Sequence, residues 1–264
     1  MKKGITFYYG YNIPVEERIK YIKKAGFDNV ITCADRKLDH QNGNIKQQMK
    51  LIKDNGLGVS SLHMAYNDED LPNLFKHGFA GYRLQKRLEK DVRTAKKYGF
   101  TCVVVHLGGK PSEIGWKRLR KVLKVCHKCN IPLALENLGD DEAFFESFKN
   151  IDDDYLKFCW DVGHSNCCQK NIEFVEKIKS KLITLHLHSN NGESDQHTLN
   201  KYGNIDWDEI AKILASLDFD INLDYEILMF YRENETPQEV VEETYKQACE
   251  LEKLIEKHRR ATTK

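Results

Sequence analysis

The stretch Leu182-Ile-Thr-Leu-His-Leu-His188 alternates with a period of two, which is typical of a β-strand. One face of this strand is predicted to carry Leu182, Thr184, His186 and His188. The other face carries only aliphatic side chains, Ile183, Leu185 and Leu187, and is suited to packing against helices. We therefore expect a strand that helices cover on one side and that presents two imidazoles on its other side.

Seven further segments have strand character: Gly4–Tyr8, Phe27–Cys33, Leu57–His63, Phe100–His106, Ile131–Glu136, Leu156–Asp161 and Ile221–Glu226. Amphipathic stretches of helical length follow them, such as Val15–Ala25 and Tyr82–Tyr98, and the residue after each of these two is a glycine. Alternating strands and helices indicate a parallel sheet, and eight strands close a TIM barrel of about 250 residues. The sequence thus predicts an α/β fold, a single (βα)8 TIM barrel over residues 1–264, with residues 258–264 as a flexible tail.

A doubly wound open sheet is the competing fold. It would be expected to carry a glycine-rich turn after its first strand, where a nucleotide binds. The turn at this place reads Tyr8-Tyr9-Gly10-Tyr11-Asn12 instead, which favours the barrel.

The composition narrows the class of partner. Lys and Arg number 41 against 40 Asp and Glu, so the formal net charge of +1 gives no general attraction to nucleic acid. No apolar run approaches the roughly 20 residues that a membrane helix needs, so we expect no membrane association. The first residues, Met-Lys-Lys-Gly-Ile-Thr-Phe, lack the apolar stretch of a signal peptide, which favours a cytoplasmic location.

The eight cysteines are interpreted as reduced thiols rather than a disulfide framework. Cys126 and Cys129 form a C-x-x-C motif in the middle of a predicted helix, and no second such motif completes a zinc site. Cys167 and Cys168 are adjacent, which is a poor geometry for one bridge.

Acidic or imidazole side chains end the inward face of six consecutive predicted strands: His63, His106, Glu136, Asp161, His186 and Glu226. The carboxyl ends of barrel strands meet at one face, where barrel enzymes keep their active sites. A single such residue at a strand end is commonly explained by hydrogen bonds to a neighbouring loop. Burying six of them together costs several kcal/mol for each charge that is not compensated. Carboxylate oxygen and imidazole nitrogen both bind Zn²⁺ or Mn²⁺ at about 2.0–2.2 Å. The pattern therefore predicts a metal site at the C-terminal face of the strands.

Two connections are long, residues 64–78 after the third strand and residues 189–205 after the seventh. Long loops in a compact fold are usually functional or disordered. Both are predicted to lie at the same face as the metal site.

The same residues carry a family resemblance. The segments that carry it are Leu135-Glu-Asn137, Trp160-Asp-Val-Gly-His164, His186-Leu-His-Ser-Asn190, Gly192-Glu-Ser-Asp-Gln-His197, Asn204-Ile-Asp-Trp207 and Tyr225-Glu226. They resemble the xylose-isomerase-like TIM-barrel superfamily, which includes sugar-phosphate isomerases, sugar epimerases and endonuclease IV-like repair enzymes. The resemblance spans the third to eighth strands, and the Asp-Val-Gly-His and Asp-x-His segments are its most specific parts.

The resemblance implies two overlapping ligand sets. In the isomerase and epimerase branch, one ion would be held by Glu136, Asp161, His186 and Glu226, and the two glutamates would move a proton. In the endonuclease-like branch, additional ions, up to three in total, would also use His63, His106, His164, Asp195 and His197. Every one of these positions carries a suitable residue type, so the ligand count favours phosphoester cleavage by a metal cluster.

The loop before Asp195 favours sugar chemistry instead. It reads Ser189-Asn-Asn-Gly-Glu-Ser194 and carries no Arg or Lys, whereas the repair enzymes have a basic segment there. A small sugar or sugar phosphate is therefore the expected partner, and nucleic acid is the less favoured one. The oligomeric state is left open.

We accordingly expect a metal-dependent isomerase or epimerase in which Glu136 and Glu226 act as base and acid. His188 would contact a substrate hydroxyl or orient a ligand, and these two roles stay equally open. Asn137 would bind substrate or brace Glu136, and Tyr8 and Trp160 would line the pocket or pack in the core. The alternatives are a phosphoesterase with two or three metal ions and a non-catalytic barrel that only binds a sugar.

Overall fold

The computed structural model describes residues 1–65, 70–139, 142–170, 172–229 and 234–262. Its core is one parallel sheet of eight strands in the order β7-β6-β5-β4-β3-β2-β1-β8. The strands are β1 (Lys3–Thr6), β2 (Asn29–Cys33), β3 (Gly58–His63), β4 (Cys102–Val105), β5 (Leu133–Glu136), β6 (Leu156–Asp161), β7 (Leu182–His186) and β8 (Leu223–Tyr225). Each lies within its predicted segment except at Lys3, one residue earlier, so the barrel fold is confirmed.

The barrel is nearly closed, and β7 and β8 form its weakest junction. Among the described residues, these two strands share a single bridge, between Leu187 and Tyr225. The Leu187 N–H donates to the Asp224 carbonyl, and the Glu226 N–H donates to the Leu187 carbonyl, each at 2.9 Å. The other neighbouring strands are joined by ladders of three or more residue pairs.

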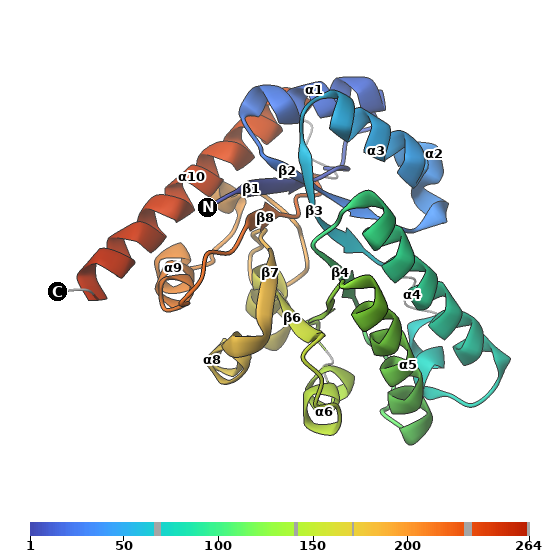
Figure 1. Ribbon diagram of the computed structural model, residues 1–264. Helices are drawn as coiled ribbons and strands as arrows, with labels where there is room; N and C mark the ends of the chain where they lie inside the picture. The colour runs from blue at the N-terminus through green and yellow to red at the C-terminus, as the bar shows by residue number, and fades with distance from the viewer. Residues whose placement is uncertain (66–69, 140–141, 171, 230–233, 263–264) are drawn as a thin grey trace.

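Helices surround the strands on the outside (Figure 1). They are α1 (Val15–Ala25), α2 (Asp39–Asn42), α3 (Ile45–Asp54), α4 (Phe79–Tyr98), α5 (Glu113–Cys129), α6 (Glu142–Asn150), α7 (Val162–His164), α8 (Glu173–Ile178), α9 (Trp207–Ala215) and α10 (Pro237–Thr262). Two short turns matter for the site, the 3₁₀ turn η2 (Leu71–Phe75) and the π-helical turn η3 (Ser165–Gln169).

Local sequence sets where several helices begin and end. Asn44 and Gln47 form a capping box that starts α3, and the Asp206 carboxylate accepts the first free N–H groups of α9. Gly26 and Gly99 end α1 and α4 with φ angles of +109° and +80°, which residues with a Cβ rarely adopt. Both glycines therefore stop their helices as the sequence predicts.

Side chains of the barrel separate into two layers, and β7 departs from the predicted alternation. Leu182 packs in the outer layer under the helices, whereas Ile183 packs inside the barrel with Val104, Ala134 and Cys159. The prediction for Leu182 and Ile183 was the reverse, because the register shifts between Phe158 and Cys159 of β6 and β7 gains one residue there. Beyond this bulge Thr184 and His186 face inward as predicted.

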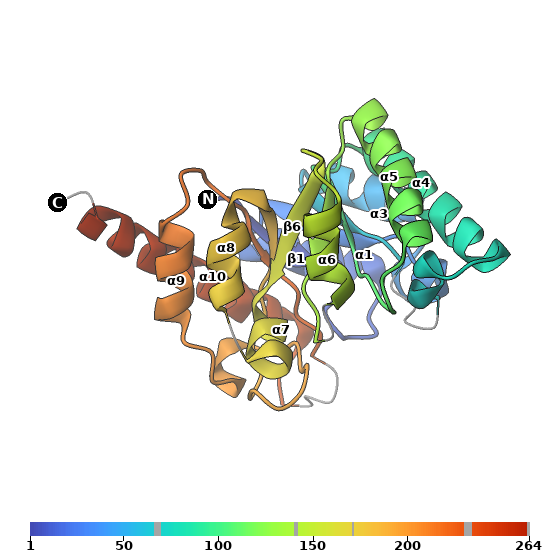
Figure 2. The same cartoon turned by 90° about the horizontal axis from the view of Figure 1, so that it is seen from below.

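The C-terminal segment corrects another expectation. Residues 258–262 continue α10 instead of forming a flexible tail. His258 bonds to the Asp208 carboxylate of α9 at 2.8 Å, and Arg259 donates to Asp220 at 2.7 Å. These contacts hold the last turns of α10 beside α9, and the two helices lie side by side in both cartoon views (Figures 1 and 2).

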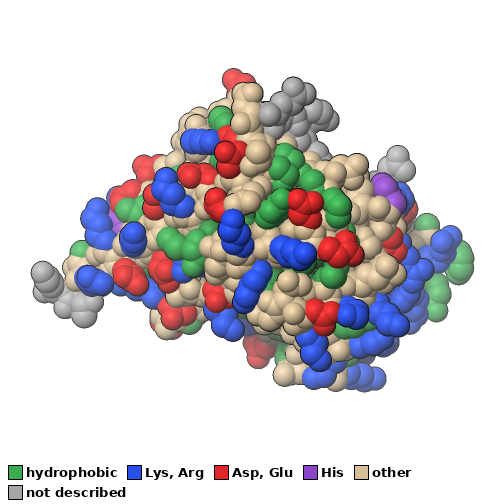
Figure 3. All heavy atoms as spheres, turned by 90° about the horizontal axis from the view of Figure 1, so that it is seen from above, with side chains coloured by type: hydrophobic (Ala, Val, Ile, Leu, Met, Phe, Trp, Pro, Cys, Tyr) green, Lys and Arg blue, Asp and Glu red, His purple; other side chains and the backbone are tan. Residues whose placement is uncertain are grey.

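The surface matches the balanced composition. Basic and acidic side chains are interspersed over the face drawn in Figure 3. Within the described ranges, no helix combines the length and the apolar character that crossing a bilayer requires.

Candidate metal centre

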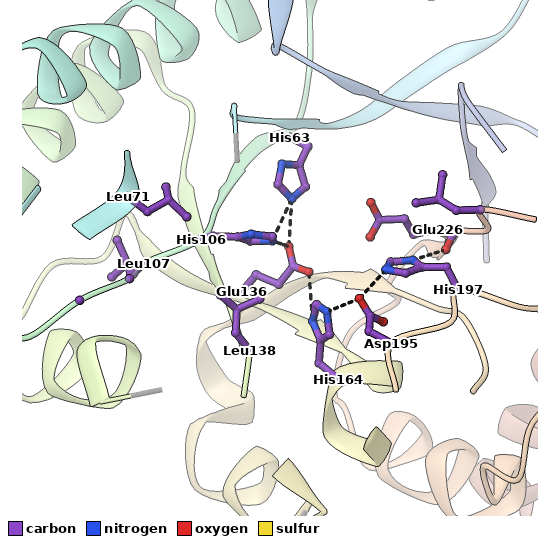
Figure 4. A pocket seen from close by; sticks show the side chains of 13 residues that line it. His63, Leu71, His106, Leu107, Glu136, Leu138, His164, Asp195, His197 and Glu226 are labelled. Atoms are coloured by element: carbon purple, nitrogen blue, oxygen red, sulfur yellow. Dashed lines mark hydrogen bonds and ion pairs between the residues drawn. The ribbon is translucent and has the colours of Figure 1, made fainter. Parts of the chain in front are cut away.

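The carboxyl ends of the strands gather the predicted ligands at one face. His63, Glu136, Asp161 and His186 are the last residues of β3, β5, β6 and β7, and His106 and Glu226 directly follow β4 and β8. His63, His106, Glu136 and Glu226 line a cavity of about 510 Å³, together with His164, Asp195 and His197 (Figure 4). The structure thus brings the six strand-end residues and the three loop residues to one face of the barrel.

The first candidate group joins Glu136, Asp161, His186 and Glu226, whose ligand atoms lie within 4.8 Å of one another. The His186 Nδ1 atom is 3.1 Å from an oxygen of Glu136 and 3.1 Å from an oxygen of Glu226. It is buried and has no hydrogen-bond partner among the described residues. Side chains that approach closely without bonding to one another converge on a common point, and this donor set fits a divalent cation there.

Two more histidines approach Glu136 from β3 and β4. His63 Nε2 is 3.2 Å and His106 Nε2 is 3.1 Å from the same carboxylate oxygen. The two Nε2 atoms are 3.2 Å apart, and a dashed line marks this contact in Figure 4. His63, Glu136 and His186 make up a second candidate group, which shares two residues with the first.

A third candidate group lies beside them and comprises His164, His188, Asp195 and His197. An Asp195 carboxylate oxygen is 3.2 Å from His164 Nε2 and 3.0 Å from His197 Nε2. His197 has a φ angle of +46°, which non-glycine residues rarely adopt and which is often found at functional sites. Paired backbone hydrogen bonds between Ser189 and Thr198, at 2.8 and 2.9 Å, hold together the ends of the loop that carries Asp195 and His197.

The carboxylates of the centre are held in the ionised form. Burial opposes the charge of Glu136, but His186 and His106 outweigh burial and lower the pKa of Glu136 well below its usual value. Burial likewise opposes the charge of Glu226, and His186 and His197 lower its pKa despite it. Both glutamates are therefore in the state that binds a cation.

The histidines show the opposite shift. Burial lowers the pKa of His63, but hydrogen bonds to Cys33 and Glu136 raise it to about 10. Burial also lowers the pKa of His164, and the charge of Asp161 and its other acidic neighbours raises it to about 11. These imidazoles hold protons that compensate the buried carboxylates, and a bound cation would take over that compensation.

None of the four residues predicted to contact substrate is among the described residues that line the cavity. His188 is fully buried, and its Nε2 atom lies 3.1 and 3.2 Å from the two carboxylate oxygens of Asp161. Asn137 is also fully buried, and it accepts from the Asp161 N–H at 2.8 Å and donates to the Asp161 carbonyl at 2.9 Å. Both residues position Asp161, which is the orienting role left open for His188.

Trp160 and Tyr8 are not among the described residues that line the cavity. The Trp160 indole is fully buried on the outer face of β6 and donates to the Ser165 hydroxyl at 2.9 Å. The Tyr8 ring packs against the Arg18 guanidinium, 4.9 Å from the ring centroid. Trp160 thus packs in the core, whereas Tyr8 is half-buried beside Arg18.

Apolar and backbone groups of the cavity had no sequence signal. Leucines from four different loops line it, accompanied by two glycines after β4: Leu71, Leu107, Leu138, Leu228, Gly108 and Gly109. Leucines in loops have no periodicity that marks them, although the pair Gly108-Gly109, which begins two residues after His106, could have indicated a close approach of backbone to ligand.

The chain has relatives and structural neighbours. A model of the xylose isomerase-like TIM barrel family matches residues 9–249. An uncharacterised protein of Methanocaldococcus jannaschii is 29% identical over 163 residues, which is 52% of this chain and 56% of that protein. The chain therefore aligns with only about half the length of this relative.

Two solved structures superpose on nearly the whole chain. A D-tagatose 3-epimerase-like protein has a TM-score of 0.77 at 20% identity and covers 100% of both chains. The D-psicose 3-epimerase of Clostridium cellulolyticum H10, solved with D-tagatose, has a TM-score of 0.71 at 17% identity and covers 98% of this chain and 99% of its own. At such identities the likeness concerns the fold, and the family model carries the assignment. The chain belongs to the xylose isomerase-like TIM barrel family.

Proposed function

We propose that this protein is a divalent-metal-dependent isomerase or epimerase that acts on a sugar or a sugar phosphate. The observation that carries the proposal is the pair Glu136 and Glu226, two ionised carboxylates on either side of His186 at 3.1 Å each. The structural neighbours are consistent with it, since one of them is an epimerase solved with D-tagatose.

Glu136, Asp161, His186 and Glu226 would hold the ion, with Zn²⁺ or Mn²⁺ as the expected metals. When bound, the ion would polarise a carbonyl or hydroxyl oxygen of the sugar, and this would acidify the neighbouring C–H bond. Glu136 extends from β5 and Glu226 follows β8, so their carboxylates reach the cavity from different sides of the barrel (Figure 4). One glutamate would remove the proton from carbon, and the other would return a proton to the adjacent position.

The cavity wall supports this chemistry. Leu71, Leu107, Leu138 and Leu228 exclude water from part of the cavity, which strengthens electrostatic interactions with the reacting atoms. Asn137 and His188 would act as positioning residues, because they fix Asp161 through its backbone and its carboxylate.

A metal-dependent phosphoesterase of the endonuclease IV type is the second candidate. Three candidate ligand groups at one face of the barrel, two of which share Glu136 and His186, favour it, because neighbouring ions about 3.5–4 Å apart can activate water and stabilise a leaving oxygen. The segment 189–194, with no basic residue, gives no support for gripping a nucleic-acid backbone.

The two candidates differ in metal content and in product. We would strip the protein of metal, reload it with Zn²⁺ or Mn²⁺, and count ions by elemental analysis. About one tight equivalent, with incorporation of solvent deuterium at carbon in a panel of ketoses and ketose phosphates, supports the isomerase. About three equivalents with phosphate release from phosphoesters supports the esterase, and sugar binding without either reaction supports a non-catalytic barrel.

Glu136→Gln and Glu226→Gln test the acid–base assignment. Each variant should lower deuterium incorporation by about 10²-fold or more, because a carboxamide cannot accept the proton. Glu193→Gln is the matched control, since Glu193 is an exposed carboxylate of the neighbouring loop, and it should keep full activity. Full turnover by either active-site variant would remove that glutamate from the mechanism.

A further inference from the structure

The adjacent cysteines Cys167 and Cys168 form a pair of contacting thiols. Their sulfur atoms lie 2.8 Å apart, with Cys167 buried and Cys168 exposed. Both belong to the π-helical turn η3, and single π-turns are frequent at functional sites. The other six cysteines are free thiols as well, but no contact between any two of their sulfurs is seen among the described residues.

This turn connects three parts of the candidate metal centre. It begins directly after His164, whose backbone N–H donates to the Asp161 carboxylate at 2.6 Å. At its far end, the Gln169 side chain accepts from Asn137 at 3.1 Å. A change in the conformation of the turn would therefore move His164 and loosen the support of Asp161.

The turn also holds the loop that carries Asp195 and His197. The Asn166 side chain donates to the side-chain oxygens of Asn190 and Asn204, both at 2.8 Å. Asn166 thus links the turn that carries the two thiols to the loop that carries Asp195 and His197.

We propose that Cys167 and Cys168 are a redox-active vicinal dithiol whose oxidation weakens metal binding at His164, His188, Asp195 and His197. The disulfide step stands on the thiol geometry alone, whereas the effect on metal rests on the metal centre proposed above. Hydrogen peroxide is the oxidant that accepts the two electrons that the thiols lose.

The exposed Cys168 thiolate attacks one oxygen of the peroxide, which releases water and leaves a sulfenic acid. The Cys167 sulfur, already in contact, then attacks the sulfenic sulfur, and a second water leaves. Two S–H bonds and one O–O bond break, one S–S bond forms, the two thiols are oxidised and the peroxide is reduced to two waters. A dithiol reductant reverses the step by thiol–disulfide exchange.

The closed ring does not fit the helical turn. Consecutive Cα atoms are about 3.8 Å apart, below the usual range of about 4.4–6.8 Å for a disulfide, and the two Cβ atoms must approach to about 3.8 Å. The two sulfur atoms already lie 2.8 Å apart, but bringing them to the bonding distance of about 2.05 Å across so short a Cα separation requires the backbone to leave the helical conformation. Oxidation would therefore unwind η3 and displace His164.

The experiment uses the full chain, reduced and then treated with one equivalent of hydrogen peroxide. We expect a mass lower by two hydrogens, the loss of two titratable thiols, and a fragment containing residues 167–168 that carries both changes. Zinc titration should then show affinity at the third group reduced by about tenfold or more, and dithiothreitol should restore it.

Variants separate the outcomes. Cys168→Ser should abolish the loss of two hydrogens and keep zinc affinity constant under peroxide. Cys129→Ser is the matched control, because it removes a half-buried cysteine of the C-x-x-C motif and should leave both effects intact. A disulfide between two chains, or sulfinic acid at Cys168 without a bridge, overturns the dithiol.

Two further results distinguish a failure of the redox proposal from a failure of the proposed function. A bridge that forms while zinc affinity stays unchanged overturns the link between oxidation and metal. A protein that binds no zinc in any redox state contradicts the metal centre itself, and the mass measurement still reports on the dithiol.

Discussion

Gly163 shows how closely single residues are fitted around the candidate metal centre. A Cβ atom at this position would lie 1.9 Å from the His188 ring, which is closer than atoms can approach. The His188 ring also stacks on His197, with 3.8 Å between ring centroids. The imidazole is therefore fixed from two sides and holds its nitrogen against Asp161.

Gly163→Ala should displace His188 and disturb Asp161. We expect the free energy of unfolding to fall by about 1–3 kcal/mol, as for overpacked cores, and zinc affinity to fall about tenfold or more. Gly139→Ala is the control, because its Cβ would meet only Cys168 Cβ, at 3.2 Å. Chemical denaturation and zinc titration measure both effects, and a Gly163→Ala protein with unchanged zinc affinity would refute the positioning role of His188.

The protonated histidines predict how metal binding depends on pH. The pKa is about 10 for His63, about 11 for His164 and about 9 for His197 in the metal-free protein. A metal binds only neutral imidazole, so protons compete with it at every pH below these values. Metal affinity should therefore rise with pH through neutrality, and binding at pH 7 should release protons.

Calorimetry in two buffers of different ionisation enthalpy measures that release. A binding heat that is the same in both buffers would mean that the imidazoles are already neutral at pH 7. Injection of the metal ion into each buffer without protein gives the heat of dilution.

The sequence predicted six candidate ligands because they end the inward faces of alternating strands, whereas His164, Asp195 and His197 were implied by the family resemblance alone. His63, Glu136 and Asp161 follow directly from that alternation and from the rule that barrel strands end at one face. Sequence reasoning could not order Leu182 and Ile183, because the bulge that exchanges their faces leaves no mark in a run of aliphatic residues. It also missed the cavity leucines, whose loop positions depend on tertiary packing.

At the scale of elements, a buried arginine ties the loop after β3 to the barrel. Arg118 of α5 donates to the carbonyls of Leu74 and Gly78, at 2.8 and 3.0 Å, and contacts further carbonyls of the same segment. The segment includes η2, whose Leu71 lines the cavity. One side chain thus satisfies several backbone oxygens that the irregular loop cannot pair by itself.

Arg118→Met should leave those carbonyls without donors. The free energy of unfolding should fall by about 3 kcal/mol, and limited proteolysis should cut residues 71–78 faster, while the metal content stays the same. Arg120→Met is the matched control, because Arg120 lies on the same helix, is exposed, and donates to one carbonyl, that of Asn150. Equal protease sensitivity of both variants would show that Arg118 does not fix the loop.

At the scale of the whole molecule, buried acidic side chains extend from the candidate metal centre into the interior of the barrel. Asp224 lies inside the barrel beneath the metal centre, where burial raises its pKa to about 6. The space beside it exists because position 4 is a glycine, whose Cβ would lie 2.0 Å from the Asp224 carboxylate. Gly4 therefore makes room for a buried carboxyl group inside the barrel.

The incomplete pairing of β7 and β8 has a consequence for how the barrel opens. His186 ends one of these strands and Glu226 follows the other, so an ion held by both would fasten the two edges that the backbone leaves almost unjoined. Amide hydrogens of Leu187 and Glu226 should then exchange with heavy water fastest in the metal-free protein and become protected on loading. The amides of β3 and β4 should change little, because the ion would stabilise the junction between β7 and β8 rather than the whole barrel.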